Sequence, residues 1–320
     1  MYKRQVEAGN IGTPLSEVAA SEQQPKWIAL EMSSFQLHDT PSLKPVVGVL
    51  TNLSPDHLDR YSTVEEYYAD KARLFANADA ESVWVVNKDD KAVTRMARDV
   101  GGHKYLFSVS KKAEASLDSR TGRLVVLGAP LLPRPDLPLL GQHNVGNALA
   151  ASLAVMAADR SHQTQKARKG IAAALRTFRS LPHRLELIGE FGGVQWINDS
   201  KATNVSSTAV AIDGMERPTV LLLGGRHKGE SYTSLADAVR RKVKRVIAYG
   251  EAATIIATDL RPVVDVVRLG SDFDEVIQAA RAAASAGEAV LLSPACSSYD
   301  MFSNYEERGE RFRTLAAKEA

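Results

Sequence analysis

The fold is decided by the stretch Val194-Gln-Trp-Ile-Asn198-Asp-Ser-Lys-Ala-Thr-Asn204, in which a short apolar run passes directly into polar residues and then into a helix-like run. A buried strand, a polar loop and a helix in this order form the repeating unit of parallel α/β sheets. Ligands bind such sheets at the carboxyl ends of the strands. The acid, lysine and hydroxyl groups of this loop therefore predict a site for a charged ligand.

The same rhythm continues to the end of the chain. A hairpin is expected first, with strands over 185–191 and 194–198 on either side of Gly192-Gly193. The expected strands that follow are 219–223, 245–249, 263–269 and 289–293, and they alternate with helices over 234–242, 251–259, 272–286 and up to Lys318. This pattern predicts a doubly wound, Rossmann-like α/β domain over residues 181–320. It has no G-x-G-x-x-G fingerprint, so dinucleotide binding is not implied.

Residues 1–180 are predicted to form a separate α/β domain. Expected strands are 27–31, 46–52 and 82–87; Ser62–Glu65 has the spacing of a helix capping box, and helices are expected over 144–158 and 165–178. Between them, 101–138 is rich in glycine and proline and predicts loops and edge strands. The domain boundary is placed near Ser180-Leu-Pro182, where a proline redirects the chain.

Composition excludes several classes of protein. The 320 residues carry 40 basic and 38 acidic side chains, a net charge of +2, with the two signs interspersed. This gives no electrostatic footprint for nucleic acid or for a membrane surface. No apolar run is long enough to span a bilayer, and a single cysteine suits a reducing compartment. We expect a cytoplasmic protein of two domains.

The first domain offers candidate metal ligands. Glu31 ends an apolar strand, and Asp56, His57 and Asp59 follow the next one. Oxygen and nitrogen donors of this kind suit Mg²⁺ or Mn²⁺. Taken alone, the Asp-x-x-Asp loop is more often a solvated turn, and Lys71, on the following helix, is more often a lysine that reaches the surface.

Other candidates lie where helices begin or break. Asn144 and Asn147 open an alanine-rich helix whose free N–H groups favour anions, although Asn144 fits a capping role equally well. Arg184 follows a helix break and could contact phosphate or form an ion pair. Gly224-Gly-Arg-His-Lys-Gly229 differs from a phosphate loop and is better interpreted as a flexible turn with one useful lysine, Lys228.

The segment Ser293-Pro-Ala-Cys-Ser-Ser298 leaves the last strand and leads towards the last helix, where hydroxyl and backbone donors suit a carboxylate. It contains Cys296, the only cysteine of the chain. No base or cation stands beside Cys296 in the sequence, so buried packing is favoured over a nucleophilic role.

Together these motifs resemble the Mur ligase family, and the resemblance covers nearly the whole chain. Seven motifs occur in the family's order: Gly9-Asn-Ile-Gly12, Glu31-Met-Ser-Ser-Phe-Gln36, Asp56-His-Leu-Asp-Arg60, Gly141-Gln-His-Asn144, Leu181-Pro-His-Arg184, Asn198–Asn204 and Ser293–Ser298. The resemblance implies an ATP-dependent ligase that phosphorylates the carboxylate of UDP-N-acetylmuramoyl-L-alanine and joins it to D-glutamate. It further implies that 1–180 is a partial central ATP-binding domain of the P-loop type, that 181–320 binds the incoming amino acid, and that the protein is a monomer.

The resemblance also implies residue roles. Glu31 would hold one Mg²⁺, and His57 with a carbamylated Lys71 would hold a second. Nucleotide contacts would come from Asn144, Asn147, Arg184, Asp199 and Lys201, and the catalytic set would be His57, Lys71 and Lys201. Substrate contacts would come from Asn10, Ser33 and His57 on the muramoyl side and from Thr203, Lys228, Ser298, Tyr299 and Tyr305 on the D-glutamate side. Tyr299 and Tyr305 stand where family members can have leucine and phenylalanine.

One departure lies at the start of the chain. Family members carry a UDP-binding domain and a Gly-Lys-Ser/Thr phosphate loop before the Gly-Asn-Ile-Gly motif, and no Gly-Lys-Ser/Thr occurs in these 320 residues. We therefore expect an incomplete central domain, without its first strand, phosphate loop and helix, and a chain that is inactive alone. Three alternatives stay open: another Mur or folylpolyglutamate-type ligase, a non-catalytic fragment that binds nucleotide or amino acid, and a dehydrogenase.

Overall fold

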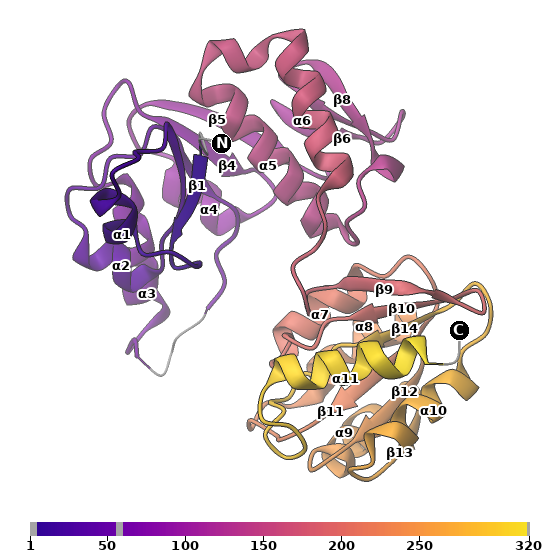
Figure 1. The fold of residues 1–320 in the computed structure, drawn as a ribbon. Helices are drawn as coiled ribbons and strands as arrows, with labels where there is room; N and C mark the ends of the chain where they lie inside the picture. The colour runs from indigo at the N-terminus through magenta and orange to yellow at the C-terminus, as the bar shows by residue number, and fades with distance from the viewer. Residues whose placement is uncertain (1–4, 56–59, 319–320) are drawn as a thin grey trace. The chain divides into compact units, whose positions relative to one another are not determined.

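The computed structural model describes residues 5–55 and 60–318, and its chain divides into two compact units (Figure 1). The first unit runs to Arg134 and includes Gly146–Ala173; the second comprises Pro135–Val145 and everything from Ala174 onwards. The last of these divisions lies a few residues before the boundary expected near Ser180.

The second unit is built on one six-stranded sheet. Its strands are β9 (Glu186–Phe191), β10 (Val194–Asn198), β11 (Thr219–Gly224), β12 (Val243–Tyr249), β13 (Asp265–Arg268) and β14 (Ala289–Leu292). They lie in the order β13-β12-β11-β14-β10-β9, and all neighbours are parallel except β9 and β10, which form the expected hairpin. The prediction of a doubly wound domain is confirmed.

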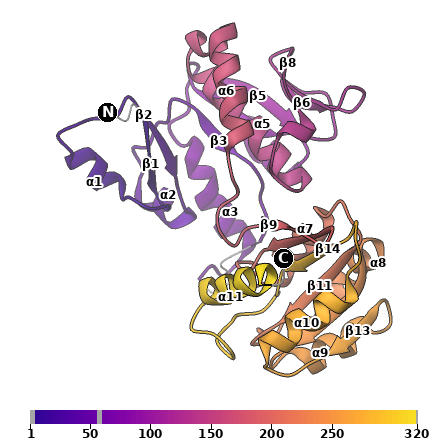
Figure 2. The same cartoon turned by 45° about the vertical axis from the view of Figure 1, so that its right-hand side comes forward.

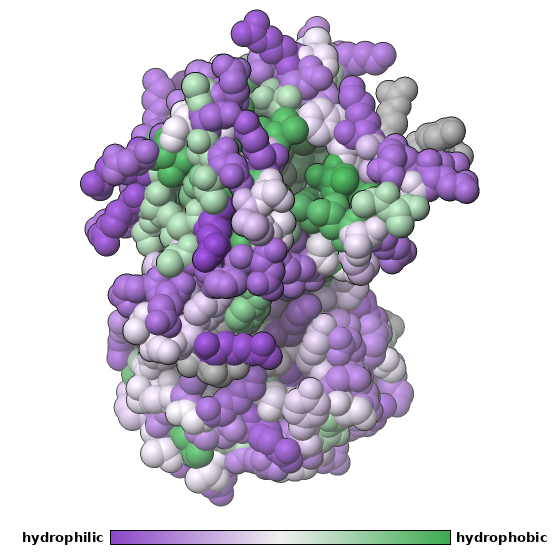
Figure 3. Space-filling model, turned by 90° about the vertical axis from the view of Figure 1, so that its left-hand side faces the viewer, coloured by the Kyte–Doolittle hydropathy of each residue, from purple (hydrophilic) through white to green (hydrophobic). Residues whose placement is uncertain are grey.

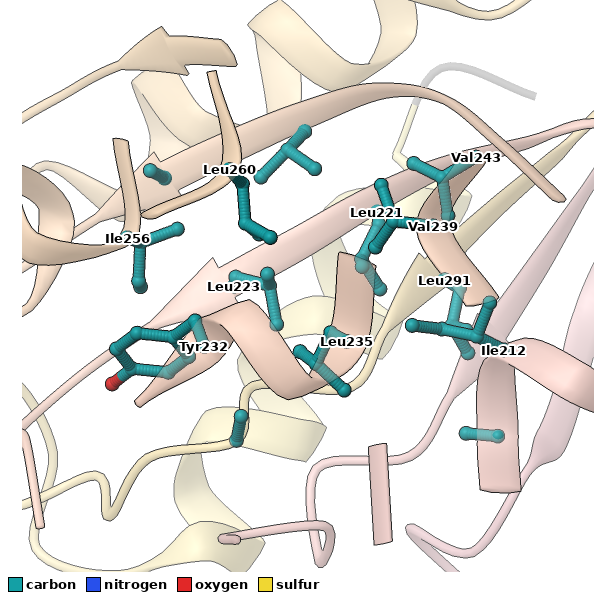
Figure 4. Close-up of a cluster of buried hydrophobic side chains, with 14 of the residues drawn as sticks. Ile212, Leu221, Leu223, Tyr232, Leu235, Val239, Val243, Ile256, Leu260 and Leu291 are labelled. Atoms are coloured by element: carbon teal, nitrogen blue, oxygen red, sulfur yellow. The ribbon is translucent and has the colours of Figure 1, made fainter. Parts of the chain in front are cut away.

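Alternating side chains of these strands build two cores, one on each face of the sheet. Leu221 and Leu223 of β11 lie in one core, which Figure 4 shows packed with side chains such as Ile212, Val239 and Ile256. Val220 and Leu222, the residues in between, lie in the other core. Five helices supply the covering layers: α7 (Val205–Asp213), α8 (Ala236–Lys242), α9 (Ala253–Leu260), α10 (Phe273–Ala283) and α11 (Tyr305–Ala317). Successive side chains of a strand point to opposite faces of the sheet, and both faces are buried here. These strands are therefore continuous apolar runs in the sequence.

The first unit contains two sheets. A parallel pair, β1 (Gln5–Gly9) and β2 (Trp27–Glu31), stands apart from a six-stranded sheet whose order follows the sequence. The strands of that sheet are β3 (Gly48–Leu50), β4 (Val83–Asn87), β5 (His103–Ser108), β6 (Ala115–Asp118), β7 (Arg123–Val126) and β8 (Ala129–Pro133). Its last three strands form an antiparallel meander, which accounts for the irregular stretch that the sequence predicted as loops and edge strands.

Six α-helices lie wholly or mostly in the described part of the first unit: α1 (Leu15–Ala20), α2 (Ser34–Asp39), α3 (Val64–Ala72), α4 (Lys91–Ala97), α5 (Gln142–Ala158) and α6 (Gln165–Thr177). The first residues of α5 and the last residues of α6 belong to the second unit. The two longest, α5 and α6, lie side by side in both views (Figures 1 and 2). The N-cap of α3 is Thr63, one residue after the expected Ser62, and its hydroxyl accepts from the amide of Glu66. The Glu66 carboxylate accepts from the amide of Ser62 and not from that of Thr63, so the expected capping box is not formed.

Apolar side chains gather on the surface of the first unit, as Figure 3 shows on one face. Five large apolar residues within its first fifty residues are more than a third exposed: Ile11, Leu15, Ile28, Val46 and Val49. Across the described ranges, every helix is too short or too polar to cross a membrane.

Candidate functional site

The three central strands of the second unit, β10, β14 and β11, end at the same edge of the sheet. This is the topological switch point of the sheet, because the chain runs from β10 across to β11 and outwards before β14 returns between them. Three polar segments leave the sheet here: the β10 loop (199–204), the β11 loop (225–229) and the β14 loop (293–298). The side chains predicted to bind D-glutamate lie on these loops, directly after the β14 loop at Tyr299, and at the start of α11.

The loops hold one another through backbone hydrogen bonds. The amide of Ala295 donates to the carbonyl of Ala202 (3.0 Å), and the amide of Arg226 donates to the carbonyl of Ser297 (2.9 Å). Ala295 itself has φ of 56°, in the left-handed region that costs energy for any residue with a Cβ. The three loops therefore form one cross-linked surface, and the β14 loop is kept in a strained conformation by its neighbours.

Asn198 ends β10 and Asp199 begins the β10 loop, and both are buried. Asn198 Nδ2 donates to Gly309 O (3.3 Å) and lies 3.0 Å from His183 Nδ1, so this amide fastens the loop to α11 and to the motif Leu181–Arg184. The carboxylate of Asp199 accepts from the amide of Leu185 (3.1 Å) and from the Ser293 hydroxyl (2.8 Å). Asp199 was predicted to contact nucleotide, and that role stays a prediction.

Burial raises the pKa of Asp199 to about 7, against the opposing effect of its hydrogen bonds from Ser293 and Leu185 and of the Arg184 charge. The geometry around the carboxyl can accommodate the neutral acid. An acid proton on Asp199 would donate to Ser293 Oγ, which would then donate to Thr208 Oγ1 (3.1 Å), and Thr208 donates to Ser293 O (3.2 Å). A protonated Asp199 thus completes a chain of hydroxyl donors inside the second unit.

Polar side chains of different loops contact one another at the carboxyl-end edge of the sheet. Lys228 Nζ donates to Thr203 Oγ1 (3.2 Å), which joins the β11 loop to the β10 loop. Lys201 places its ammonium 5.3 Å from the ring centroid of Tyr305, the first residue of α11. Of the other predicted D-glutamate residues, Ser298 is 3% exposed and Tyr299 is 64% exposed.

Cys296 lies beneath this surface and is fully buried, as predicted. Its Sγ is 2.9 Å from the hydroxyl of Tyr232, and burial raises the pKa of the thiol to about 11. A thiol in this state is a poor nucleophile at neutral pH, so the side chain packs rather than reacts.

Arg308 of α11 is a functional candidate that the sequence analysis missed. It is fully buried, and its guanidinium reaches groups from all three strand ends, including Ser200 O (2.8 Å) and Cys296 O (3.2 Å). The sequence did contain a signal, because Arg308 falls on the same helix face as Phe312 and Leu315, four and seven residues on, which are also buried.

In the first unit, Asn10 and Glu31 meet where β1 and β2 end. The strands pair up to Gly9 and Glu31, and Asn10 Nδ2 then donates to Glu31 Oε1 (2.9 Å). Both side chains are exposed. Ser33 caps α2 two residues later in a full capping box with Gln36, so its hydroxyl already accepts from the Gln36 amide (3.2 Å).

The other residues predicted to bind metal or nucleotide lie on separate helices and loops. Lys71 lies near the end of α3 with its ammonium 5.8 Å from the ring centroid of Tyr67. Asn144 lies in the first turn of α5 and donates to Leu140 O (2.8 Å), Asn147 follows on the same helix, and Arg184 is exposed. His57 lies outside the described residues.

Glu31 provides a carboxylate suited to Mg²⁺, which commonly takes only one or two protein carboxylates and completes its shell with water and phosphate. Within residues 5–55 and 60–318, three or more His, Cys, Asp or Glu side chains nowhere converge as a metal-binding group. The donor chemistry at Glu31 thus fits a magnesium ion held together with a phosphate ligand, and does not resemble an all-protein cage.

Comparison with known proteins identifies the family. Residues 5–155 match the family model "Mur ligase middle domain", and residues 183–296 match "Mur ligase, glutamate ligase domain". The chain is 38% identical over 313 residues to the UDP-N-acetylmuramoylalanine–D-glutamate ligase of Acidobacterium capsulatum, covering 96% of this chain and 66% of that protein. It is 39% identical to the ligase of the same name from Desulfatibacillum aliphaticivorans, covering 95% of this chain and 67% of that protein.

The chain thus spans about two thirds of the length of the curated relatives that it matches. Among solved structures, the MurF ligase from Thermotoga maritima in complex with ADP has the same fold, with a TM-score of 0.68 and 15% identity over 98% of this chain and 73% of that one. Two domain models in the expected order and relatives close to 40% identical lead to one conclusion. The chain belongs to the Mur ligase family.

Proposed function

We propose that this chain carries the central and C-terminal parts of an ATP-dependent ligase that adds D-glutamate to UDP-N-acetylmuramoyl-L-alanine. In that reaction the γ-phosphoryl group of ATP passes to the substrate carboxylate, which gives an acyl phosphate and ADP. The amine of D-glutamate then attacks the carbonyl carbon, an amide bond forms, and phosphate leaves with the electron pair of the broken C–O bond. The amine loses a proton in the process.

The observation that carries this proposal is the contact between Lys228 and Thr203 at the switch point of the second unit. Lys228 is exposed at the edge of the sheet, so its ammonium can form a charge-assisted hydrogen bond with a carboxylate. In the proposal, D-glutamate binds here with its carboxylates towards Lys228, Thr203, Ser298 and the start of α11 at Tyr305. Tyr299, which is largely exposed, would border the site.

We propose 1–180 as the nucleotide domain and 181–320 as the amino-acid domain. Asn144 and Asn147 at the start of α5 would contact the adenine. Arg184, Asp199 and Lys201 would contact the ribose or phosphates, and the hydrogen bonds of the buried Asp199 would also hold the β10 loop in place. Asn10 and Ser33 would contact the muramoyl substrate.

Glu31 is proposed to hold Mg²⁺, and Lys71 and His57 to serve a second ion. A lysine ammonium cannot ligate a cation, so Lys71 would take part as its carbamate, which presents carboxylate-like oxygens. When bound, Mg²⁺ would offset the negative charge on the phosphate oxygens during transfer. A cytoplasmic location, expected from the composition, and a monomeric state remain predictions.

The proposal is tested by titrating the chain with amino acids and measuring heat or chemical-shift changes. D-glutamate should bind, and L-glutamate, D-aspartate and meso-diaminopimelate should bind at least about tenfold more weakly. Substituting Lys228→Met should weaken D-glutamate binding by about tenfold to a hundredfold, the effect of losing one charge-assisted hydrogen bond. The control is Lys242→Met, which removes a lysine that bonds Met215 O elsewhere in the same unit.

Binding of meso-diaminopimelate in preference to D-glutamate would assign the chain to a different amino acid within the family. Equal D-glutamate binding by wild type and Lys228→Met would remove the β11 loop from the site. The nucleotide half is tested in the same way with MgADP, for which Glu31→Gln should weaken binding only when Mg²⁺ is present.

A further inference from the structure

We infer that Arg308 is a positioning residue that fixes the β10, β11 and β14 loops in the arrangement that binds the amino acid. The identity of the ligand, D-glutamate, rests on the proposed function. The role of the Arg308 side chain rests on the geometry of the second unit alone. Arg308 itself is fully buried and so is not offered as a ligand contact.

The guanidinium of Arg308 donates hydrogen bonds to groups at the ends of three strands, β10, β14 and β11. Its Nε donates to Ser200 Oγ (2.9 Å) and its Nη2 to Ser200 O (2.8 Å), on the β10 loop. Both terminal nitrogens reach Cys296 O, at 3.2 and 3.3 Å, on the β14 loop. Nη1 also lies 3.5 Å from Gly224 O, where β11 ends. One side chain from α11 thus ties together the three segments that leave the switch point.

This arginine differs from the other arginines of its helix. Arg313 pairs with Glu186 (2.7 Å) and Arg311 with Asp274 (2.5 Å), whereas within the described ranges no carboxylate lies within 4.0 Å of the Arg308 guanidinium. A buried cation without a paired acid is costly, and here only carbonyl and hydroxyl oxygens offset that cost. Such a group stabilises one particular backbone arrangement, because a rigid fork of donors is satisfied only when its acceptors stand in fixed positions.

The backbone around Arg308 is shaped to admit it. A Cβ on Gly225 would lie 3.2 Å from Arg308 Nη1 and 2.2 Å from Ser297 O, so only glycine allows the β11 loop this close. The hydrogen bonds to Cys296 O also hold the residue directly after Ala295, whose left-handed conformation would otherwise relax. Through these contacts the side chain would set where Lys201, Lys228 and Ser298 stand relative to one another.

The experiment compares Arg308→Met and Arg308→Lys with Arg313→Met in the whole chain. Hydrogen exchange is read at the amides of Ala295 and Arg226, which cross-link the loops, and at the β12 amides as a measure of global opening. In Arg308→Met, protection of the two loop amides should fall at least about tenfold more than protection of β12. Arg308→Lys should restore part of it, since an ammonium still donates to the carbonyls. Arg313→Met should lower all amides together.

Binding supplies the second readout. D-glutamate affinity should fall about tenfold or more in Arg308→Met and less than about twofold in Arg313→Met, with partial rescue of Arg308→Met by added guanidinium. Uniform loss of protection in both variants, or unchanged loop protection in Arg308→Met, would overturn the inference. If the wild-type chain binds no D-glutamate, the proposed function fails, and the exchange measurement still decides whether Arg308 fixes the loops.

Discussion

The carboxyl end of β10 in the second unit and that of β1 in the first show two ways of building a polar site on parallel strands. An asparagine stands at each place. Asn198 is fully buried among His183, Glu186 and Gly309, whereas the side chain of Asn10 is exposed and donates to the neighbouring Glu31. The first arrangement is fixed before any ligand arrives. The second leaves its polar groups in water, where a ligand must organise them.

The difference follows from the sheets that carry the two residues. β10 lies inside a six-stranded sheet with cores on both faces, so the loops that leave it are covered by their neighbours. β1 pairs only with β2 in a two-stranded sheet, so little surrounds the strand ends. Preorganised groups lower the entropic cost of binding, and exposed groups accommodate a ligand that brings its own metal and phosphate. We therefore expect substitutions of the buried polar residues at the end of β10 to lower stability, and substitutions of the exposed residues at the end of β1 to change ligand binding with little effect on stability.

The largest effect is expected at Gly225, where the β11 loop passes closest to its neighbours. Gly225→Ala should lower the free energy of unfolding of the second unit by about 4 kcal/mol or more, because the new Cβ would meet the Ser297 carbonyl at 2.2 Å and φ is 126°. The control is Gly229→Ala in the same loop, with φ of 86° and open space around the new Cβ. It should cost about 1 to 2 kcal/mol.

Urea unfolding, followed through hydrogen exchange of the β11 and β14 amides, measures both variants. Similar losses for Gly225→Ala and Gly229→Ala would mean that the loops are not packed against one another as described. The comparison between the two units would then lose its basis.

The next effect concerns pH and the carboxyl of Asp199. Burial raises its pKa to about 7 from 3.8, so the folded chain holds this proton between about pH 4 and 7 while the unfolded chain has released it. The folded state therefore binds more protons in this window, and the contribution of Asp199 to stability falls as pH rises through it, by about 4 kcal/mol, and then levels off.

Asp199→Asn removes this titration and keeps the shape of the neutral acid. The difference in unfolding free energy between wild type and Asp199→Asn, measured at pH 4.5, 6 and 8, should shift in favour of the variant as pH rises. Taking the difference cancels the carboxylates whose pKa is lowered, such as Asp70 and Glu288, which act in the opposite direction. If the unfolding free energy of the wild type instead rises relative to that of Asp199→Asn between pH 4.5 and 7, the carboxyl of Asp199 is not buried in its neutral form.

Some features of the second unit could be predicted from the sequence and others could not. Strand ends and their polar residues, such as Thr203 and Lys228, were predictable because short continuous apolar runs that alternate with helical patterns indicate a doubly wound sheet. The Asp199 bond to Ser293 was not, because it depends on β14 inserting beside β10 from 94 residues further along the chain. Arg308 was hidden in a run of charges that is otherwise typical of a solvated helix face.

The smallest effect is expected at Asn10, and it is the one that separates the two sites most directly. Asn10→Ala removes one hydrogen bond between exposed side chains and should change the free energy of unfolding by less than about 0.5 kcal/mol. Asn198→Ala removes a fully buried amide and leaves its neighbours without partners, so it should cost about 2 to 3 kcal/mol. Both are measured by urea unfolding of the whole chain.

The two substitutions should also affect the binding of different ligands. Without the Asn10 amide, Glu31 loses the donor that orients its carboxylate, so Asn10→Ala should alter MgADP binding in the proposed nucleotide site by about two- to threefold while leaving D-glutamate binding unchanged. Asn198→Ala should weaken D-glutamate binding in proportion to the disorder that it introduces in the β10 loop. If Asn10→Ala instead destabilises the chain as strongly as Asn198→Ala, the end of β1 is as preorganised as the end of β10, and the distinction between an open and a preformed site does not hold.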